Sequence, residues 1–307
     1  MKFNDRDLIV EMTSEWKGER FPDGRPRVSD DLLRRVRAIT TEEAWVPMAK
    51  AGYKLQYEGD LRATHGGNLL VGRAVTAVFV PSRPDVHMIM LEHGRAEEKR
   101  KGFFNQWVVD SLVEDDVLVV DMCDQIVYGT YVGGNLSTAI KSRTKRGGAV
   151  IWGGIRDLQQ IVKIPDFQVY YRGIHPSPIG DVMMTGMNVP CRIGKAVCMP
   201  GDVVLGTISG VTFIPAHMVE DIVVRAEKSH VRDAFGFERL NSGVYTSAQI
   251  DQDVWGEEMM RDFMAWFAVS EAAKGYQHLN WDGELALSRQ PRDAAAVFNG
   301  TVVYDWK

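Results

Sequence analysis

The sequence predicts a mixed α/β fold with many short strands. Apolar, β-rich runs at residues 69–80, 117–122 and 149–152 are typical of strands, and the first of these is apolar enough for burial on both faces. Stretches with helical signals separate the runs, and glycine or proline turns end many of them. Strand and helix signals that alternate in this way are typical of α/β proteins.

The bulk composition excludes several classes of protein. The chain has 307 residues, with 45% hydrophobic and 25% charged residues and a net charge of −5, so it lacks the basic character expected of a nucleic-acid partner. Its three cysteines, without CxxC spacing, argue against a disulfide scaffold and a structural zinc. No apolar run approaches the roughly 18 residues that span a bilayer, and the first residues lack a signal-peptide core. We therefore expect a soluble cytoplasmic protein with no membrane partner.

Capping signals set the expected order of the elements. Residues 1–28 are polar and turn-rich, as in an arm that lies over a core or a neighbouring subunit. Ser29 is a suitable N-cap for a helix over residues 30–37, and Thr40 with Glu43 forms a capping box for a helix over residues 41–51. The remaining patterns predict helices at 88–113, 216–240 and 254–273, a strand at 167–171, and short β segments over 188–214.

Three features have more than one interpretation. The HGGN sequence at residues 65–68 is either a backbone cradle for a ligand or, as is more common, a turn. The basic cluster at residues 141–146 fits cations near a helix C-terminus, where the helix dipole favours them. His175 lies in a proline-rich loop and fits a structural or exposed role better than a catalytic one.

The stretch most informative about function is residues 133–157, GGNLSTAIKSRTKRGGAVIWGGIRD. Asn135 is a good N-cap for a helix over about residues 137–146, and the preceding glycines let the backbone approach a ligand closely. Gly147 suits the position that ends this helix. A strand over residues 149–152 and a turn at 153–154 then place Arg156 and Asp157 at a strand end.

This arrangement predicts an anion site beside a carboxylate. Free amides at a helix start bind anions, and here they would lie near one fixed cation and one acid. An anionic, carbonyl-bearing substrate with a divalent metal suits such a site. The alternative is that Arg156 and Asp157 form a solvated surface pair, as most such neighbours do, and that the glycine pairs only end elements. No GxSxG elbow, P-loop or HExxH motif offers rival chemistry.

The same stretch resembles the central motif of the RraA-like family. Its enzymatic members, the class II 4-hydroxy-4-methyl-2-oxoglutarate / 4-carboxy-4-hydroxy-2-oxoadipate aldolases, have an acidic residue followed after twenty residues by Arg-Asp. In this chain Asn135 stands in the first position and Arg156-Asp157 in the second. Flanking motifs also match, namely GRAVT at 72–76, DDVLVVD at 115–121, and PGDVV at 200–204 followed by GVTFIP at 210–215.

The resemblance implies a compact α/β sandwich of the swivelling ββα type, like phosphohistidine domains, with N- and C-terminal helical extensions. It divides the chain into an arm at 1–33, an RraA-like domain at 34–243, and an extension at 244–307 that packs on the core or a neighbouring subunit. It also implies a homo-oligomer, either a trimer or a dimer of trimers.

The activity implied is that of a lyase on a 2-oxo acid, by retro-aldol cleavage to pyruvate or decarboxylation of an oxaloacetate-like acid through an enolate. Asp157 would hold Mg²⁺, Mn²⁺ or another divalent cation through few protein ligands and several waters. Arg156 and the backbone around Gly134, Leu136 and Ser137 would bind the substrate. Asn135 would replace the family acid.

An amide cannot move a proton, so the resemblance leaves the base open. Asp233 or Glu227 of an adjacent subunit are candidates, since family sites lie at subunit interfaces. Two further functions remain open. One is a non-catalytic protein that binds and regulates a ribonuclease, as the founding member of the family does without the Asp of the pair. The other is a sugar-acid lyase, dehydratase or isomerase that uses the same metal site.

Overall fold

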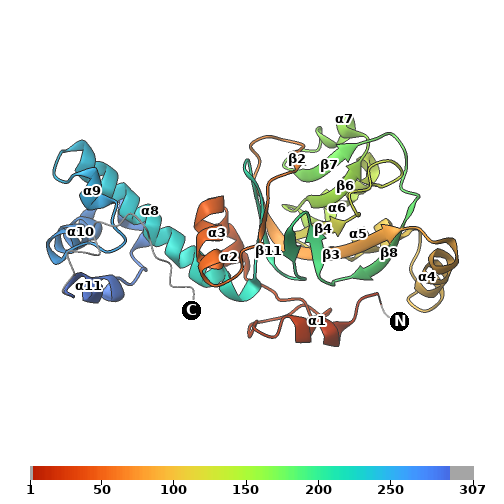
Figure 1. The fold of residues 1–307 in the computed structure, drawn as a ribbon, viewed down its shortest axis with the longest axis horizontal. Helices are drawn as coiled ribbons and strands as arrows, with labels where there is room; N and C mark the ends of the chain where they lie inside the picture. The colour runs from red at the N-terminus through yellow and green to blue at the C-terminus, as the bar shows by residue number, and fades with distance from the viewer. Residues whose placement is uncertain (1–2, 291–307) are drawn as a thin grey trace. The chain divides into compact units, whose positions relative to one another are not determined.

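A computed structural model describes residues 3–290 of the chain, which separates into two compact units (Figure 1). The first is Met1–Glu220 and the second begins at Asp221. The sequence placed the end of the α/β domain further along, at residue 243. Among the described residues no helix is both long and apolar enough to cross a membrane.

The first unit is organised around one large sheet. In the described part of the chain, ten strands join it, and its centre is a parallel set. The parallel strands are β3 (Leu70–Pro81), β4 (Asp116–Asp121), β6 (Ala149–Ile155), β7 (Val169–Ile174) and the short β5 (Thr130–Val132). Antiparallel partners extend it: β1 (Tyr57–Glu58), β2 (Arg62–Ala63), β8 (Val182–Met187), β11 (Val203–Thr207) and β12 (Gly210–Ile214). The predicted mixed α/β class is therefore confirmed.

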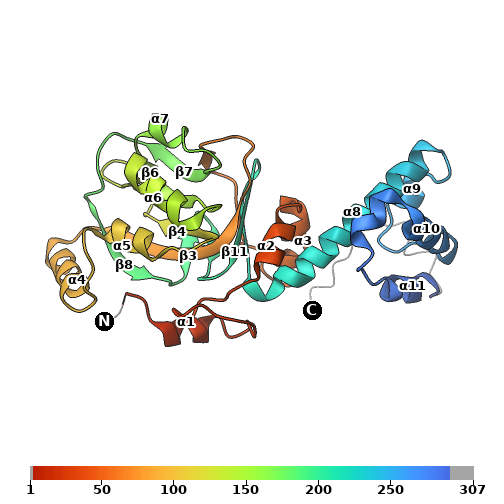
Figure 2. The ribbon, with the colours of Figure 1, turned by 180° about the vertical axis from the view of Figure 1, so that it is seen from behind.

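Both faces of the central strands are buried. Alternate residues of a strand point to opposite faces, so each strand contributes to two apolar clusters. One cluster packs Leu118, Val120 and Ile151 under α5 (Phe104–Ser111) and α6 (Gly134–Thr144), which lie on one side of the sheet in Figure 2. The other packs Val117, Val119 and Val150 against a separate hairpin of β9 (Cys191–Ile193) and β10 (Ala196–Cys198). This explains why the run at residues 69–80 is mostly apolar.

The glycine pair at 153–154 was predicted to form a turn, and this is wrong. Both glycines continue β6, which ends at Ile155. A Cβ on Gly153 would lie 2.5 Å from the Met122 Cβ, and one on Gly154 would lie 2.8 Å from the Ile126 carbonyl oxygen. These glycines therefore allow the loop after β4 to cross closely over the strand.

The helix caps near the N-terminus confirm the sequence analysis. Ser29 Oγ accepts the Leu32 amide to begin α2 (Asp30–Val36). Thr40 and Glu43 form a reciprocal capping box at the start of α3 (Thr41–Lys50). Upstream, α1 (Arg6–Met12) is capped by Asp5.

The expected helix over residues 88–113 is instead two helices, α4 (Pro84–Ala96) and α5. Residues 97–103 separate them, with positive φ at Lys99 and Gly102.

The arm before α2 is held by a buried ion pair. Arg25 is 2% exposed, and its Nη1 donates to Oδ1 of the buried Asp116 at 2.9 Å. Its Nε donates to Asp23 Oδ2 at 2.7 Å, and the guanidinium lies 4.7 Å from the Phe21 ring centroid. Burial raises the pKa of Asp116, and the Arg25 guanidinium opposes that rise. Arg25 thus fastens the arm to the first residue of β4.

The second unit is helical and has its own core. Its elements are α8 (Val219–Asn241), which begins two residues before the unit boundary, α9 (Ser247–Ile250), α10 (Glu257–Val269), η2 (Glu271–Tyr276) and α11 (Asp282–Ser288). Aromatic and methionine side chains of α10 are buried here, with Phe263 packed edge-on against Trp281 at 4.7 Å between ring centroids. These side chains therefore form the core of the second unit. Residues 291–307 of the predicted extension lie outside the described residues.

Candidate functional site

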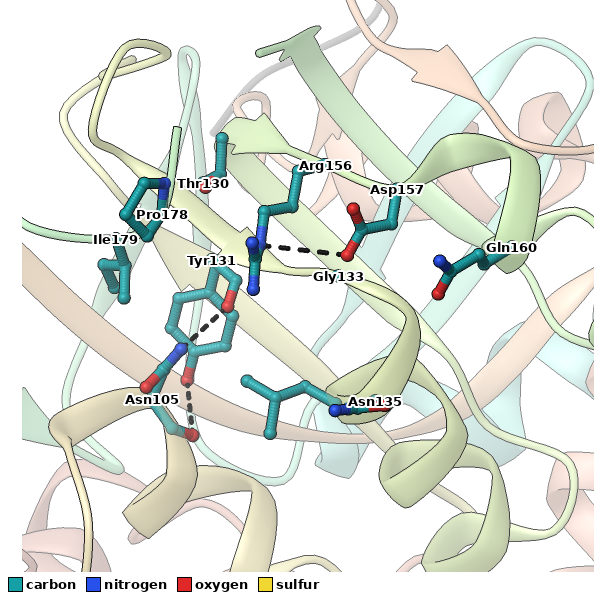
Figure 3. Close-up of a pocket in the computed structure, with 11 residues that line it drawn as sticks. Asn105, Thr130, Tyr131, Gly133, Asn135, Arg156, Asp157, Gln160, Pro178 and Ile179 are labelled. Atoms are coloured by element: carbon teal, nitrogen blue, oxygen red, sulfur yellow. Dashed lines mark hydrogen bonds and ion pairs between the residues drawn. The ribbon is translucent and has the colours of Figure 1, made fainter. Parts of the chain in front are cut away.

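A cavity of about 300 Å³ opens at the carboxyl end of β5 and β6 in the first unit (Figure 3). The end of parallel strands is where α/β proteins commonly bind ligands. The start of α6, the residues after β6, and one residue of α5 supply its polar lining, while the loop after β7 closes one side. The lining residues are Asn105, Thr130, Tyr131, Gly133, Asn135, Leu136, Arg156, Asp157, Gln160, Pro178 and Ile179.

The helix that faces the cavity begins earlier than the sequence predicted. Gly133 occupies the N-cap position of α6, so Asn135 is its second residue and not its cap. The reason is close packing. A Cβ on Gly133 would collide with the Asp157 carboxylate, and one on Gly134 would collide with the Gln160 side chain. The glycines therefore bring the first turn directly against the segment after β6. At the other end Lys145, with φ 61°, rather than Gly147, ends the helix.

Two amides of this first turn remain free. The Gly134 amide donates to Asp157 Oδ2 at 3.2 Å, and the Ser137 amide donates to the Gly133 carbonyl at 3.0 Å. The amides of Asn135 and Leu136 donate to no described residue, as expected for N–H groups at a helix start. The amides of Gly134 and Ser137, two residues that the sequence analysis assigned to substrate binding, thus both have partners within the chain. The Ser137 side chain is also fully buried.

Asp157 takes an uncommon backbone conformation that aims its side chain at the helix. Its φ of 55° and ψ of 34° are left-handed, a region that Asp tolerates better than most residues. It precedes α7 (Leu158–Ile161) without capping it, and its side chain turns to α6 instead. Oδ1 accepts no hydrogen bond within residues 3–290, so one oxygen is available for a ligand.

Arg156 presents a half-exposed guanidinium to the same cavity. Its amide donates to the Val132 carbonyl at 3.0 Å, which fixes the residue at the end of β6 beside β5. Its Nε lies 3.8 Å from Asp157 Oδ2, beyond hydrogen-bond distance, and its side chain is 43% exposed. Its donors make no hydrogen bond to the part of the chain that the structure describes. The pair is therefore neither buried nor closed on itself, and Figure 3 shows both side chains beside the turn that carries Asn135.

The opposite wall was not predicted from the sequence. The Asn105 side chain donates to the Tyr131 carbonyl at 2.9 Å, and the Tyr131 hydroxyl donates to the Asn105 carbonyl at 3.4 Å. Burial raises the pKa of Tyr131 well above its usual value, so this phenol stays protonated near neutral pH. Pro178 and Ile179 complete the wall, and His175 Nδ1 lies 2.9 Å from Ser177 Oγ in the same loop. His175 itself does not line the cavity.

A divalent cation fits the cavity only as a largely hydrated ion. Within residues 3–290 no group of three or more His, Cys, Asp or Glu residues is placed to hold a metal. Asp157 is the carboxylate that lines the cavity, with Oδ1 available. Mg²⁺ commonly binds one or two carboxylates and retains several waters, so this donor set fits Mg²⁺ and does not fit a structural zinc.

The two acids considered as bases, Glu227 and Asp233, lie on α8 within the second unit. Glu227 is 9% exposed, and its Oε2 lies 3.2 Å from His278 Nε2 of the same unit. Asp233 borders a surface hollow with Arg232. Neither acid lines the cavity beside Arg156 within its own chain.

Substitution of Asp157 separates its backbone role from its charge. We expect Asp157→Ala to lower the free energy of unfolding by about 2 kcal/mol, from the left-handed conformation and the lost bond to the Gly134 amide. Asp157→Asn keeps both the tolerance of positive φ and one acceptor, so we expect a loss within about 1 kcal/mol. Urea denaturation of both variants measures this, and equal losses would contradict it.

Comparison with known proteins gives matches over much of the first unit. A family model described as RraA-like: Aldolase/RraA matches residues 26–213, more than half of the chain. A curated protein of Halalkalibacterium halodurans, named as a candidate 4-hydroxy-4-methyl-2-oxoglutarate aldolase, is 30% identical over 121 residues. That match covers 38% of this chain and 55% of the relative, so the chain spans about half the length of the curated protein it matches.

Solved structures share the fold at low identity. RraAS2 of Streptomyces coelicolor, described as an unusual member of the RNase ES inhibitor RraA protein family, has a TM-score of 0.59 at 24% identity, covering 69% of this chain and 100% of that one. An uncharacterized protein of Pseudomonas syringae pv. tomato has a TM-score of 0.59 at 17% identity, covering 76% and 98%. A structure described among novel cellulases from gut-associated microbes has a TM-score of 0.59 at 24% identity, covering 75% and 96%. These similarities show the fold alone.

Proposed function

Because the chain belongs to the RraA-like family, Aldolase/RraA, we propose that it is a lyase that cleaves a 2-oxo acid. The reaction is retro-aldol cleavage that releases pyruvate, or decarboxylation of an oxaloacetate-like acid. Both pass through the enolate of pyruvate, so one site that stabilises this enolate serves both.

One observation carries the proposal. The free donors of Arg156, the two free amides of α6 and the available oxygen of Asp157 meet in one cavity. The amides of Asn135 and Leu136 lie at the positive end of the α6 dipole, which favours a substrate carboxylate. If Arg156 and Asp157 formed only a surface ion pair, there would be no need for free amides beside them. Nor would there be a need for Gly133 and Gly134, which bring these amides close to the pair.

Arg156 then stabilises the charge that develops as the C–C bond breaks. The Val132 hydrogen bond fixes its backbone at the end of β6, and its guanidinium keeps its donors for the substrate. A preorganised donor at a developing oxyanion typically lowers the barrier by about 3–4 kcal/mol. The apolar side of the cavity, Leu136 and Ile179, limits water around this charge.

Asp157 would hold a divalent cation, Mg²⁺ or Mn²⁺, through Oδ1 and intervening waters. When bound, such an ion supplies Lewis-acid polarisation of a carbonyl. The bond from the Gly134 amide to Oδ2 fixes the carboxylate for this role.

The proton donor or acceptor must come from another group. Asn135 is an exposed amide that neither takes up nor releases a proton near neutral pH. Burial keeps Tyr131 protonated, so it is no base, and raises its pKa so far that it is a poor proton donor. We assign the role to Glu227 or Asp233 of a neighbouring subunit in a trimer or dimer of trimers. Glu227→Gln and Asp233→Asn, measured for pyruvate release against pH, distinguish the two. The assignment fails if neither variant changes the profile.

A direct assay tests the proposed function. We expect pyruvate release from oxaloacetate and from 4-hydroxy-4-methyl-2-oxoglutarate with Mg²⁺, and its loss in EDTA with recovery on excess Mg²⁺. Turnover that is indifferent to EDTA contradicts the metal. The absence of turnover on both acids, together with capture of a ribonuclease, indicates the regulatory function instead. Water loss from a sugar acid without pyruvate release indicates a dehydratase.

A further inference from the structure

A second cavity of about 410 Å³ lies at the other end of α6, in the same unit. It opens near the amino ends of β6 and β7, whereas the candidate active site lies at the carboxyl ends of β5 and β6. Its lining comes from the end of α2, the loop before β3, the last turn of α6, and the residues before β7. The lining residues are Arg37, Gly67, Asn68, Leu69, Leu70, Lys141, Lys145, Arg146, Gly147, Asp166 and Gln168.

Positive charge dominates this lining, although the chain as a whole carries −5. Of its four cations, Arg146 is compensated by a two-point pair with Asp115, with Nη2 at 2.7 Å from Oδ2. Lys141 donates to the backbone carbonyl of Asp166 at 2.9 Å, which does not neutralise its charge. Arg37 and Lys145 form no ion pair within residues 3–290. Against these cations the cavity presents one acid, Asp166.

The helix dipole explains only part of this arrangement. It favours Lys141 and Lys145 near the C-terminus of α6, but it does not bring Arg37 there from α2. Arg143, on the same helix, faces elsewhere and pairs with Asp110 at 3.0 Å. The cations of the cavity therefore come from two helices, α2 and α6, and line one concave surface. A concave surface lined by charges of one sign has a stronger electrostatic potential, here a positive one.

A buried donor in the lining supports a ligand independently of the charges. Gln168 is 2% exposed, and its Nε2 has no hydrogen-bond partner. Burial raises the pKa of Tyr170 to about 12, and the nearby Gln168 side chain opposes that rise; the Tyr170 hydroxyl itself donates to the Thr207 carbonyl at 2.7 Å. A buried N–H without a partner is costly unless a ligand or water satisfies it.

We infer that this cavity binds a small molecule that carries phosphate groups. Lysine ammonium groups and an arginine fork are the side chains that proteins use for phosphate, and a cavity of this size accepts a ligand as large as a nucleotide. The Gln168 side-chain amide and the Asn68 backbone amide supply neutral donors, whereas the Gly67 amide already donates to the His65 carbonyl at 2.9 Å. The HGGN sequence, of which Gly67 and Asn68 are part, thus acquires a role as one wall of the site.

The test is a calorimetric titration with pyrophosphate, in EDTA so that no divalent cation takes part. We expect saturable binding to the wild-type protein. Lys145→Gln and Arg37→Gln each weaken it about tenfold, as expected for loss of one charged contact. The matched control is Arg143→Gln, which removes the same charge from α6 outside the cavity and changes affinity less than twofold. Gln168→Met, which removes the buried amide and keeps a side chain of similar volume, should also weaken binding.

Each contrary result overturns the inference. Absence of saturable binding removes the site. Equal weakening by Arg143→Gln and Lys145→Gln shows a diffuse field with no defined site. Loss of binding in Arg156→Gln places the pyrophosphate in the other cavity. Binding of an RNA oligonucleotide through Arg37 and Lys145, with none of pyrophosphate, assigns the surface to nucleic acid.

Discussion

Arg156→Ala is expected to lower kcat for pyruvate release by about 10²–10³-fold. The guanidinium is the cation that lines the cavity, and its donors are not used by the described part of the chain. Because the interaction strengthens as charge develops, kcat should fall more than KM rises. Arg156→Lys should recover only part of the rate, since an ammonium keeps the charge but lacks the planar fork.

The control is Arg83→Ala, which removes an exposed arginine that also pairs with a near neighbour, Asp85, at 2.9 Å. It should leave kcat unchanged. A rate within tenfold of wild type for Arg156→Ala, in a variant that binds Mg²⁺ and unfolds normally, would mean that the cavity has another function.

Arg25→Met is expected to lower the free energy of unfolding by about 3–5 kcal/mol. The substitution keeps an unbranched apolar stem but removes the guanidinium, and so leaves Asp116, which is fully buried, without its partner. In the folded variant Asp116 either keeps a charge without a partner or takes up a proton. If it takes up a proton, the pKa of Asp116 is higher in the folded variant than in the unfolded chain. The loss of stability should therefore grow as pH rises above the unfolded pKa of an aspartate.

Guanidinium denaturation at several pH values measures this effect. Arg27→Met is the matched control on the same arm, because Arg27 pairs with Glu19 at 3.0 Å in an exposed position. Such pairs contribute about 0–1 kcal/mol, so the control should unfold almost as the wild type does. Equal losses in the two variants would show that the arm, rather than the buried pair, carries the stability.

The family and the position of the Arg-Asp pair could be predicted because they depend on local signals. The motifs recur in order along the chain, and the family model confirms the resemblance. Arg156 and Asp157 follow an apolar run, so a strand end was expected there, and β6 ends at Ile155. The caps at Ser29 and Thr40 were equally predictable, since each depends on side chains within four residues.

The start of α6 could not be predicted because it depends on a distant segment. Asn135 is the better cap by residue type, yet Gly133 takes the position because Asp157 and Gln160 leave no room for a Cβ. The wall of Asn105 and Tyr131 joins α5 to β5, which only the sheet topology brings together. The same holds for Arg25, whose burial depends on a contact with a strand 91 residues later.

The bond between Gly134 and Asp157 makes the order of a helix depend on what occupies the site. A ligand that draws the carboxylate toward itself weakens its hold on the amide. Ligand binding in the cavity and opening of the first turn of α6 are then coupled equilibria. Hydrogen–deuterium exchange at Gly134 should therefore report occupancy directly, without any measurement of turnover.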